Sequence, residues 1–129
     1  MPNQNQAHTK LISETITLIN MFEGQYTVRA YSTRQGGTYT PASEYGPGHY
    51  NKQAWHKLVG HADILVMAKN NKQIWLECKT GEGVQSPAQK EFEAWCAKCS
   101  IPYCVFHDKG EALAFLKFQG VLGGKVGGV

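Results

Sequence analysis

Arginine is scarce in this chain of 129 residues, since Arg29 and Arg34 are the only arginines among 13 basic side chains. A partner recognised through many bidentate guanidinium contacts is therefore not expected. The formal net charge of +3 is compatible with a polyanionic partner but does not require one. With 42% hydrophobic and 18% charged residues, the composition is typical of one ordinary globular domain.

Long apolar runs are also missing. The apolar run at residues 64–68 is far shorter than the roughly 20 residues needed to span a bilayer. Residues 1–8 are polar and lack the basic and apolar regions of a signal peptide. Because no export signal is recognisable, we expect a cytoplasmic protein with reduced thiols. Those thiols belong to Cys78, Cys96, Cys99 and Cys104.

Hydrophobic periodicity predicts one α/β domain over residues 10–118, after a loose leader at 1–9 and before a glycine-rich tail at 119–129. We expect a mixed central sheet flanked by helices, in the order α-β-β-β-α-β-α. Residues 36–50 hold glycine and proline without a period and predict a long loop, and 53–59 predict a short strand or turn. The helices are expected at 10–23, 86–99 and 108–118, and the strands at 26–32, 61–68, 73–79 and 101–107.

Charged residues stand at the ends of two expected strands. Asp63 opens one strand, and Glu77 and Lys79 end the next on a shared face, because they are two residues apart. Burying such charges is unfavourable unless they are paired or hold a metal. Two carboxylates with the Cys78 carbonyl between them suit a hard cation such as Mg²⁺ or Mn²⁺. A structural ion-pair network at the strand ends is the alternative.

A divalent cation beside an ammonium group is suited to phosphodiester hydrolysis. The metal activates water and neutralises charge on the phosphate, and Lys79 orients the nucleophile or stabilises the same charge. This chemistry sets a geometric condition, because residues that face one another in an antiparallel ladder point to the same side. A two-residue turn would place Asp63 opposite Cys78 and away from Glu77. We therefore predict a three- or five-residue connection, such as 69–71, or a bulge near Asp63.

Three short motifs resemble a known family. They are the sequences GHAD at 60–63, ECKTG at 77–81 and SPAQ at 86–89. An acid followed two residues later by lysine arises by chance in many chains, but the three motifs together, at this spacing, resemble the PD-(D/E)XK nuclease superfamily. Within it the chain is similar to the VRR-NUC group, which includes small phage proteins. The resemblance covers roughly residues 10–116.

The resemblance implies a restriction-endonuclease-like fold and assigns roles to five residues. Asp63, Glu77 and the backbone carbonyl of Cys78 would bind the metal, and Lys79 would be catalytic. Gln89, from the following helix, would reach into the site, although an ordinary helix-surface amide is an alternative for this residue.

One further acid and two departures belong to the same comparison. Many members carry an acid near the metal on the first helix, and Glu14 matches that place, with an exposed helix carboxylate as the alternative. Ala62 stands where the family usually has proline, which affects backbone stiffness. Cys78 stands where an aliphatic residue is common, but a metal ligand that is the backbone carbonyl does not depend on the side chain.

The activity implied by the resemblance is Mg²⁺- or Mn²⁺-dependent, structure-selective cleavage of DNA that leaves a 5′-phosphate. Small members are expected to act as homodimers on branched DNA, Holliday junctions in particular, and a phage-encoded member would act in the bacterial host cytoplasm. A flap or restriction-type nuclease on the same fold, and a non-catalytic DNA-binding protein, are the alternatives.

Basic residues outside these motifs are candidate contacts to the DNA backbone, with a solvated surface as the alternative. They are Arg29, Arg34, Lys52 and Lys57. A separate run of potential zinc ligands is less persuasive, because its last two members are three positions apart in a strand and would face opposite sides. That run comprises Cys96, Cys99, Cys104 and His107.

Overall fold

The computed structural model of the chain describes residues 4–33, 38–40, 42–51 and 60–122. Its elements are α1 (Gln4–Asn20), β1 (Val28–Ser32), β2 (Thr38–Thr40), β3 (His49–Asn51), β4 (Ile64–Ala68), β5 (Lys72–Cys78), α2 (Pro87–Lys98), β6 (Tyr103–Phe106) and α3 (Lys109–Phe118). The main sheet has the order β1-β4-β5-β6, in which the first two pairings are antiparallel and the last is parallel. The predicted α/β class with a mixed central sheet is therefore confirmed.

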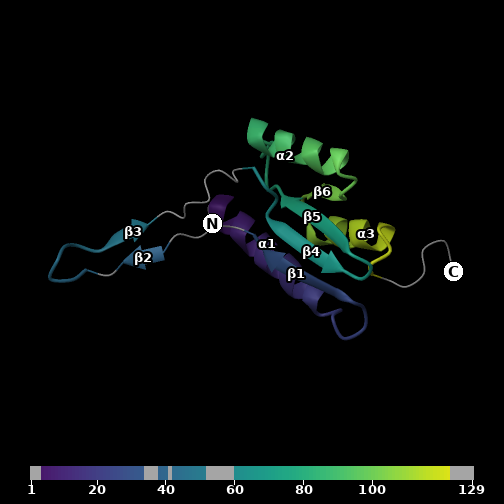
Figure 1. The fold of residues 1–129 in the computed structure, drawn as a ribbon, viewed down its shortest axis with the longest axis horizontal. Coiled ribbons are helices and arrows are strands. Elements are labelled where there is room, and N and C mark those ends of the chain that lie inside the picture. Colours follow the sequence, from purple (N-terminus) through teal and green to yellow (C-terminus); the bar gives the residue numbers. More distant parts are fainter. Residues whose placement is uncertain (1–3, 34–37, 41, 52–59, 123–129) are drawn as a thin grey trace.

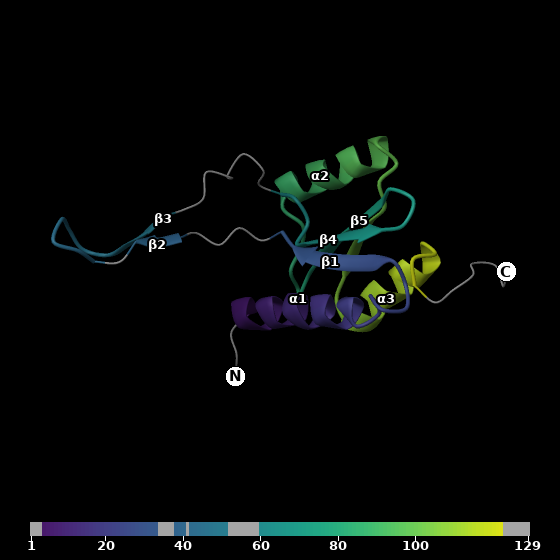
Figure 2. The ribbon, with the colours of Figure 1, turned by 60° about the horizontal axis from the view of Figure 1, so that its bottom comes forward.

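Helices cover both faces of the main sheet. Helices α1 and α3 lie on one face and α2 on the other (Figures 1 and 2). The core fills the space between the sheet and the α1–α3 layer, where alternate strand residues such as Ile64, Val66 and Leu76 are completely buried against Ile19 and Leu116. No helix among the described residues is both long and apolar enough to cross a membrane.

Helix α1 begins at Gln4, so the predicted loose leader at 1–9 is wrong for most of its length. Polarity alone misled the prediction, since a surface helix needs only one apolar face. The helix ends at Asn20, three residues before the predicted end. The Asn20 amide donates to the Ala30 carbonyl at 3.1 Å and accepts from the Ala30 N–H at 2.8 Å. These two hydrogen bonds tie the end of α1 to the edge of β1.

The connection between β4 and β5 has the length that the sequence argument required. Ile64 pairs with Leu76 and Ala68 with Lys72, which leaves residues 69–71 as a three-residue turn. Its last two residues, Asn70 and Asn71, have φ values of 65° and 61°. This left-handed conformation is tolerated by asparagine better than by most residues. The predicted odd-length connection is therefore confirmed, and continuing the register by one residue places position 63 opposite position 77.

The segment at 36–50 was predicted as a loop, but its described part forms a two-stranded antiparallel sheet. In it β2 pairs with β3, and an isolated bridge joins Ser43 to Gly46 between them. Figure 1 shows this hairpin apart from the main sheet. Three-residue strands are too short to produce a readable period, so the prediction failed here. The predicted strand or turn at 53–59 and the tail at 123–129 lie outside the described residues.

The α2 face of the main sheet is only partly covered. Phe92 of α2 packs edge-on against Trp75 of β5, with ring centroids 5.1 Å apart, and lies 6.1 Å from Tyr103 of β6. Over β1 and β4 none of the described helices covers this face, and Met67 is 49% exposed. A continuous apolar run such as that of β4 is typical of a strand covered on both faces, so the exposure of Met67 differs from what the sequence pattern predicts. Trp95 of α2 is 56% exposed, and the Lys98 ammonium group lies over its ring.

Candidate functional site

Three predicted site residues meet on the α2 side of the sheet, at the end of β5. Lys79 Nζ lies 2.8 Å from Gln89 Oε1 and 3.4 Å from Glu77 Oε2. Gln89 Nε2 donates to the same carboxylate oxygen at 2.7 Å. The Glu77 side chain is 1% exposed and that of Lys79 is 14% exposed. The acid and the amine predicted from the motif at 77–81 therefore form a buried ion pair held by an amide.

The first turn of α2 fixes the orientation of Gln89. Ser86 is the N-cap, and its hydroxyl accepts from the Gln89 N–H at 3.2 Å. In return, Gln89 Oε1 accepts from the Ser86 N–H at 2.8 Å, which completes a capping box. Pro87 at the first helical position suits this geometry. Because Oε1 faces the donors of Ser86 and Lys79, the amide nitrogen is directed at Glu77.

Gly60, the first residue of the motif at 60–63, is a position that requires glycine. Its φ is +99°, and a Cβ built there would lie 2.4 Å from the Ala88 carbonyl oxygen. Only a residue without a side chain allows the backbone to approach the first turn of α2 this closely. The segment that leads into Asp63 and the helix that carries Gln89 are thereby packed together.

Asp63 lies at the start of β4, where the backbone ladder ends. Its Oδ2 accepts from the Cys78 N–H at 2.9 Å, and its own carbonyl accepts from the Thr33 N–H at 2.9 Å. The Asp63 side chain is 13% exposed. The carboxylate is thus held beside the backbone of Cys78, one residue from Glu77, as the convergence of the two acids requires.

A histidine from α1 reaches the same place. His8 Nε2 lies 2.8 Å from the Cys78 carbonyl oxygen and 3.7 Å from Asp63 Oδ2. The sequence argument missed this residue because it placed His8 in the leader. The signal was present, since His8 precedes the fully or nearly buried residues Ile12, Thr15 and Ile19 at helical spacings of four, three and four.

Glu77 has a strongly perturbed environment. Burial raises its pKa to about 7, the nearby Asp63 carboxylate adds to the rise, and Lys79 and His61 oppose it. While Oε2 is bound by Gln89 and Lys79, Oε1 is buried and has no hydrogen-bond partner among the described residues. A buried acceptor without a partner is costly, so this carboxylate is suited to receiving a proton or a cation.

Glu14 lies elsewhere on α1. Its carboxylate is 43% exposed and lies 3.5 Å from Lys109 Nζ and 4.0 Å from Lys10 Nζ. The structure therefore places Glu14 in surface ion pairs, and the α1 residue that contacts Asp63 and Cys78 is His8.

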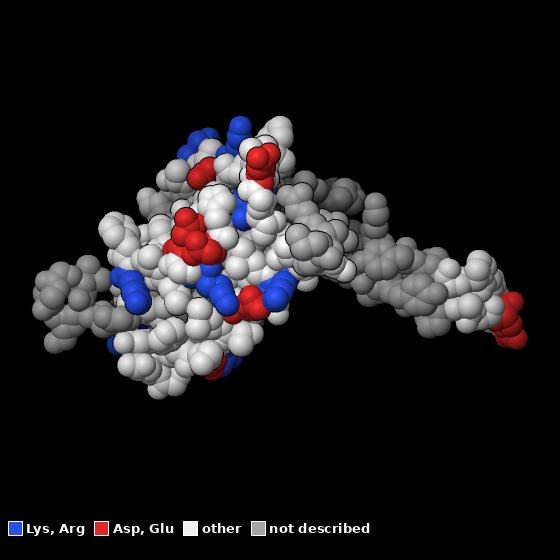
Figure 3. All heavy atoms as spheres, turned by 180° about the vertical axis from the view of Figure 1, so that it is seen from behind, with Lys and Arg blue, Asp and Glu red and all other residues white. Residues whose placement is uncertain are grey.

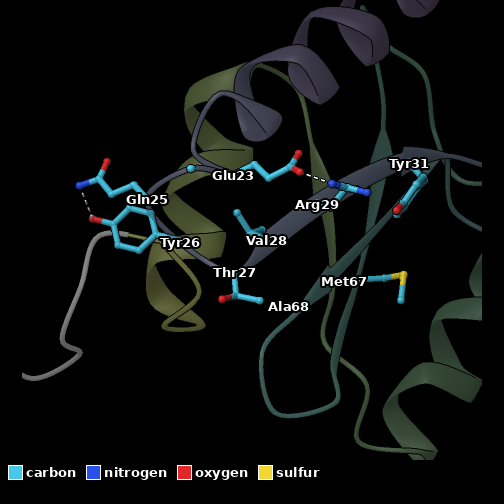
Figure 4. A pocket seen from close by; sticks show the side chains of 10 residues that line it. Glu23, Gln25, Tyr26, Thr27, Val28, Arg29, Tyr31, Met67 and Ala68 are labelled. Carbon is cyan, nitrogen blue, oxygen red and sulfur yellow. Dashed lines mark hydrogen bonds and ion pairs between the residues drawn. The ribbon is translucent and has the colours of Figure 1, made fainter.

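Of the predicted DNA contacts, Arg29 alone lies in the described part of the chain. Its guanidinium is hydrogen-bonded to the Glu23 carboxylate, which raises the arginine pKa and lowers that of the acid. The pair borders a surface pocket of about 540 Å³ over β1 and β4, which Tyr31 and Met67 also line (Figure 4). None of the residues that meet at the end of β5 lines this pocket. The remaining candidates, Arg34, Lys52 and Lys57, lie outside the described residues.

Charge is mixed on the face of the molecule seen in Figure 3, where acidic and basic side chains are interspersed. A continuous basic field, which would favour non-specific DNA binding, is not seen among the described residues on that face. Any attraction for a polyanion there must come from local groups.

The donor set at the end of β5 is suited to a hard divalent cation. It offers the oxygens of Asp63 and Glu77 and the Cys78 carbonyl. The best support for such an ion is Glu77 Oε1, which is buried and has no hydrogen-bond partner among the described residues. Within the described ranges, no three His, Cys, Asp or Glu side chains stand close enough to form a ready-made metal site, and this includes the run from Cys96 to His107. A bound cation would therefore draw its ligands together.

Comparison with protein-family models, with curated proteins and with solved structures gives no match for this chain.

Proposed function

We propose that this chain is a divalent-metal-dependent DNA endonuclease with a PD-(D/E)XK-type active site. The observation that carries the proposal is the buried Glu77 carboxylate, which is held by Lys79 and Gln89 and faces position 63 across the β4–β5 hairpin. A buried acid with an unpartnered oxygen, a second acid opposite it and an ammonium beside it is an arrangement suited to phosphoryl chemistry.

Each residue has a defined role in this proposal. Asp63, Glu77 and the Cys78 carbonyl would hold Mg²⁺ or Mn²⁺, which supplies charge neutralisation on the phosphate and an activated water. Lys79, whose ammonium lies 3.4 Å from Glu77, would stabilise charge on the phosphate or orient the attacking water. Gln89 acts as a positioning residue, because it fixes both members of that pair.

Electrostatics make a cation necessary for this activity. Two carboxylates at one site repel a phosphodiester, and the single ammonium of Lys79 cannot offset both. Burial, and after it the nearby Asp63 carboxylate, raises the pKa of Glu77, so this position already disfavours negative charge. A divalent ion would offset the charge of the two carboxylates, so that the site attracts the phosphate.

The finer assignments extend the proposal by resemblance. Setting aside the β2–β3 hairpin, the elements follow one another as α1-β1-β4-β5-α2-β6-α3, which supports the restriction-endonuclease-like fold. We further propose that the substrate is branched DNA, Holliday junctions in particular, and that the active form is a homodimer. A twofold dimer matches the symmetry of a four-way junction and can place one site on each of two strands.

The test is a cleavage panel with purified full-length protein. Four-way junction, flap and linear duplex DNA are incubated with Mn²⁺, Mg²⁺ or EDTA, and the products are resolved by strand. We expect cleavage of the junction with either metal, none with EDTA, and a loss of at least about 100-fold in rate for Lys79→Ala. DNA binding by that variant, measured by gel shift, should be retained.

Lys117→Ala is the matched control, because this exposed lysine lies on α3, on the opposite face of the sheet. It should cut as the parent does. Preferential cutting of flaps or of linear duplex would replace the junction assignment by a flap or restriction-type nuclease. A folded protein that binds DNA but cuts none of the three substrates with Mn²⁺ would overturn the proposal in favour of a non-catalytic DNA-binding protein.

A further inference from the structure

His8 occupies a position between two oxygens assigned above to a metal. Its Nε2 lies 2.8 Å from the Cys78 carbonyl oxygen and 3.7 Å from Asp63 Oδ2. Neighbouring ligands on an octahedron with bonds of about 2.1 Å are about 3 Å apart. The two observed separations lie on either side of that value. The imidazole nitrogen thus lies beside both oxygens. Because it donates to the carbonyl, ligation would require the ring to carry its proton on Nδ1 and to turn the freed Nε2 lone pair towards the ion.

The helix holds His8 in this place. The side chain is 23% exposed and continues the buried stripe that anchors α1 to the sheet through Ile12 and Ile19. In Figure 2 the N-terminal ends of α1 and α2 lie at the same end of the sheet, on opposite faces. His8 of α1 contacts the Cys78 carbonyl and Gln89 of α2 contacts Glu77, so the two helices reach the end of β5 from opposite faces of the sheet.

A second observation at the site also indicates a ligand. Glu77 is 1% exposed, and its Oε1 has no partner among the described residues, although Oε2 has two. His61 also lies close enough to influence this carboxylate, but its Nε2 is hydrogen-bonded to the Thr33 carbonyl at 2.9 Å. His8 is therefore the histidine whose nitrogen faces the carbonyl and the acid.

We propose that His8 is a metal ligand of this site through Nε2, and that it makes the site selective for Mn²⁺ over Mg²⁺. This inference rests on the proposed function, since it concerns the same cation. Imidazole nitrogen is a good ligand for transition-metal ions, whereas Mg²⁺ takes oxygen ligands and keeps much of its water. A site that includes His8 among its ligands should bind Mn²⁺ more tightly than Mg²⁺, and this preference should depend on the histidine.

The test measures Mn²⁺ binding directly, without DNA or turnover. Free Mn²⁺ is followed by electron paramagnetic resonance during a titration, Mg²⁺ is added as a competitor, and the electron spin echo of bound Mn²⁺ is examined for ¹⁴N modulation. The variants are His8→Ala and His8→Gln, and the control is His107→Ala, an exposed histidine paired with Glu111 on α3. Circular dichroism melts establish that each variant is folded.

We expect ¹⁴N modulation in the parent and its loss in both His8 variants, with Mn²⁺ binding weakened about 10- to 100-fold. Mg²⁺ binding should change much less, and His107→Ala should match the parent. His8→Gln can still donate a hydrogen bond to the Cys78 carbonyl, so normal Mn²⁺ binding by this variant would show a structural role and overturn the inference. Modulation that persists without His8 would likewise overturn it and indicate His61.

Should His8→Ala fail to fold, His8→Gln and the spectrum of the parent still decide the matter. Parent protein that binds Mn²⁺ without ¹⁴N modulation overturns the role of His8 and leaves the nuclease proposal standing. Parent protein that binds no Mn²⁺ at all overturns both.

Discussion

Gln89 Nε2 donates to Glu77 Oε2 across 2.7 Å and thereby ties the first turn of α2 to the end of β5. The same amide accepts from Lys79 and from the Ser86 N–H through its oxygen. One side chain therefore completes a helix cap and orients the acid–amine pair, which makes it a sensitive point for both stability and activity.

Replacing Gln89 by alanine removes all three contacts at once. Because Glu77 and Lys79 then lose a buried partner, we expect the free energy of unfolding to fall by about 1–3 kcal/mol. DNA cleavage should slow by about tenfold or more beyond what the loss of folded protein explains. Urea denaturation and single-turnover cleavage measure the two effects. Lys90→Ala, an exposed neighbour on α2, is the control and should change neither quantity. Unaltered cleavage by a folded Gln89→Ala protein would contradict the positioning role.

The pKa of Glu77, raised to about 7, makes the stability of the metal-free protein depend on pH. A carboxyl whose pKa is higher in the folded state contributes stability that is fully present below its unfolded value, about 4.5, and is lost as the pH rises through about 7. In EDTA, the parent should therefore lose stability between pH 5 and pH 8 relative to Glu77→Gln. Urea denaturation at four pH values measures this difference, in which other titrating groups largely cancel. Parallel curves for the two proteins would refute the raised pKa of Glu77.

Gly60→Ala should be strongly destabilising. The new Cβ would stand 2.4 Å from the Ala88 carbonyl oxygen, and the φ of +99° is unfavourable for alanine. We expect a loss of about 1–3 kcal/mol or a displacement of α2 that separates Gln89 from Glu77. Gly24→Ala provides the matched control, since a Cβ there meets nothing within 4 Å. Thermal melts of the two variants compare them directly, and equal melting temperatures would argue against the close approach.

Glu14→Gln is predicted to have little effect. The carboxylate is partly exposed and pairs with Lys10 and Lys109, and surface ion pairs of this kind contribute about 0–1 kcal/mol. Cleavage rate and Mn²⁺ affinity should remain within about threefold of the parent. Asp63→Asn, measured in parallel, should abolish cleavage, because it removes a carboxylate assigned to the metal. A large loss of Mn²⁺ affinity in Glu14→Gln would restore the role that the family resemblance implies for this acid.

The features that sequence reasoning predicted well are those with a strict geometric rule. Asp63 and Glu77 can point to the same side of the sheet only if the connection between β4 and β5 has an odd number of residues, and residues 69–71 provide it. The Ser86-Pro87 pair predicted the start of α2, because a serine N-cap and a first-turn proline are favoured by backbone geometry. Such rules depend on neighbours in sequence alone.

Other features depend on long-range packing and were missed for that reason. The first turns of α1 are polar, so the sequence did not predict that they are helical. The position of His8 depends on how this helix packs, which brings its imidazole to the Cys78 carbonyl. The apolar run in β4 indicated burial on both faces, yet α2 is placed over β5 and β6, which leaves Met67 exposed. Where a helix lies across a sheet is a tertiary property that the local pattern does not encode.

The short connection at 69–71 has a consequence for how this molecule can change. Adding or deleting one residue there would slide β4 against β5 by a single step and turn Asp63 to the opposite side of the sheet from Glu77. Changes of two residues would leave the acids together. Any variation in the length of this loop is therefore compatible with the proposed chemistry only in even increments.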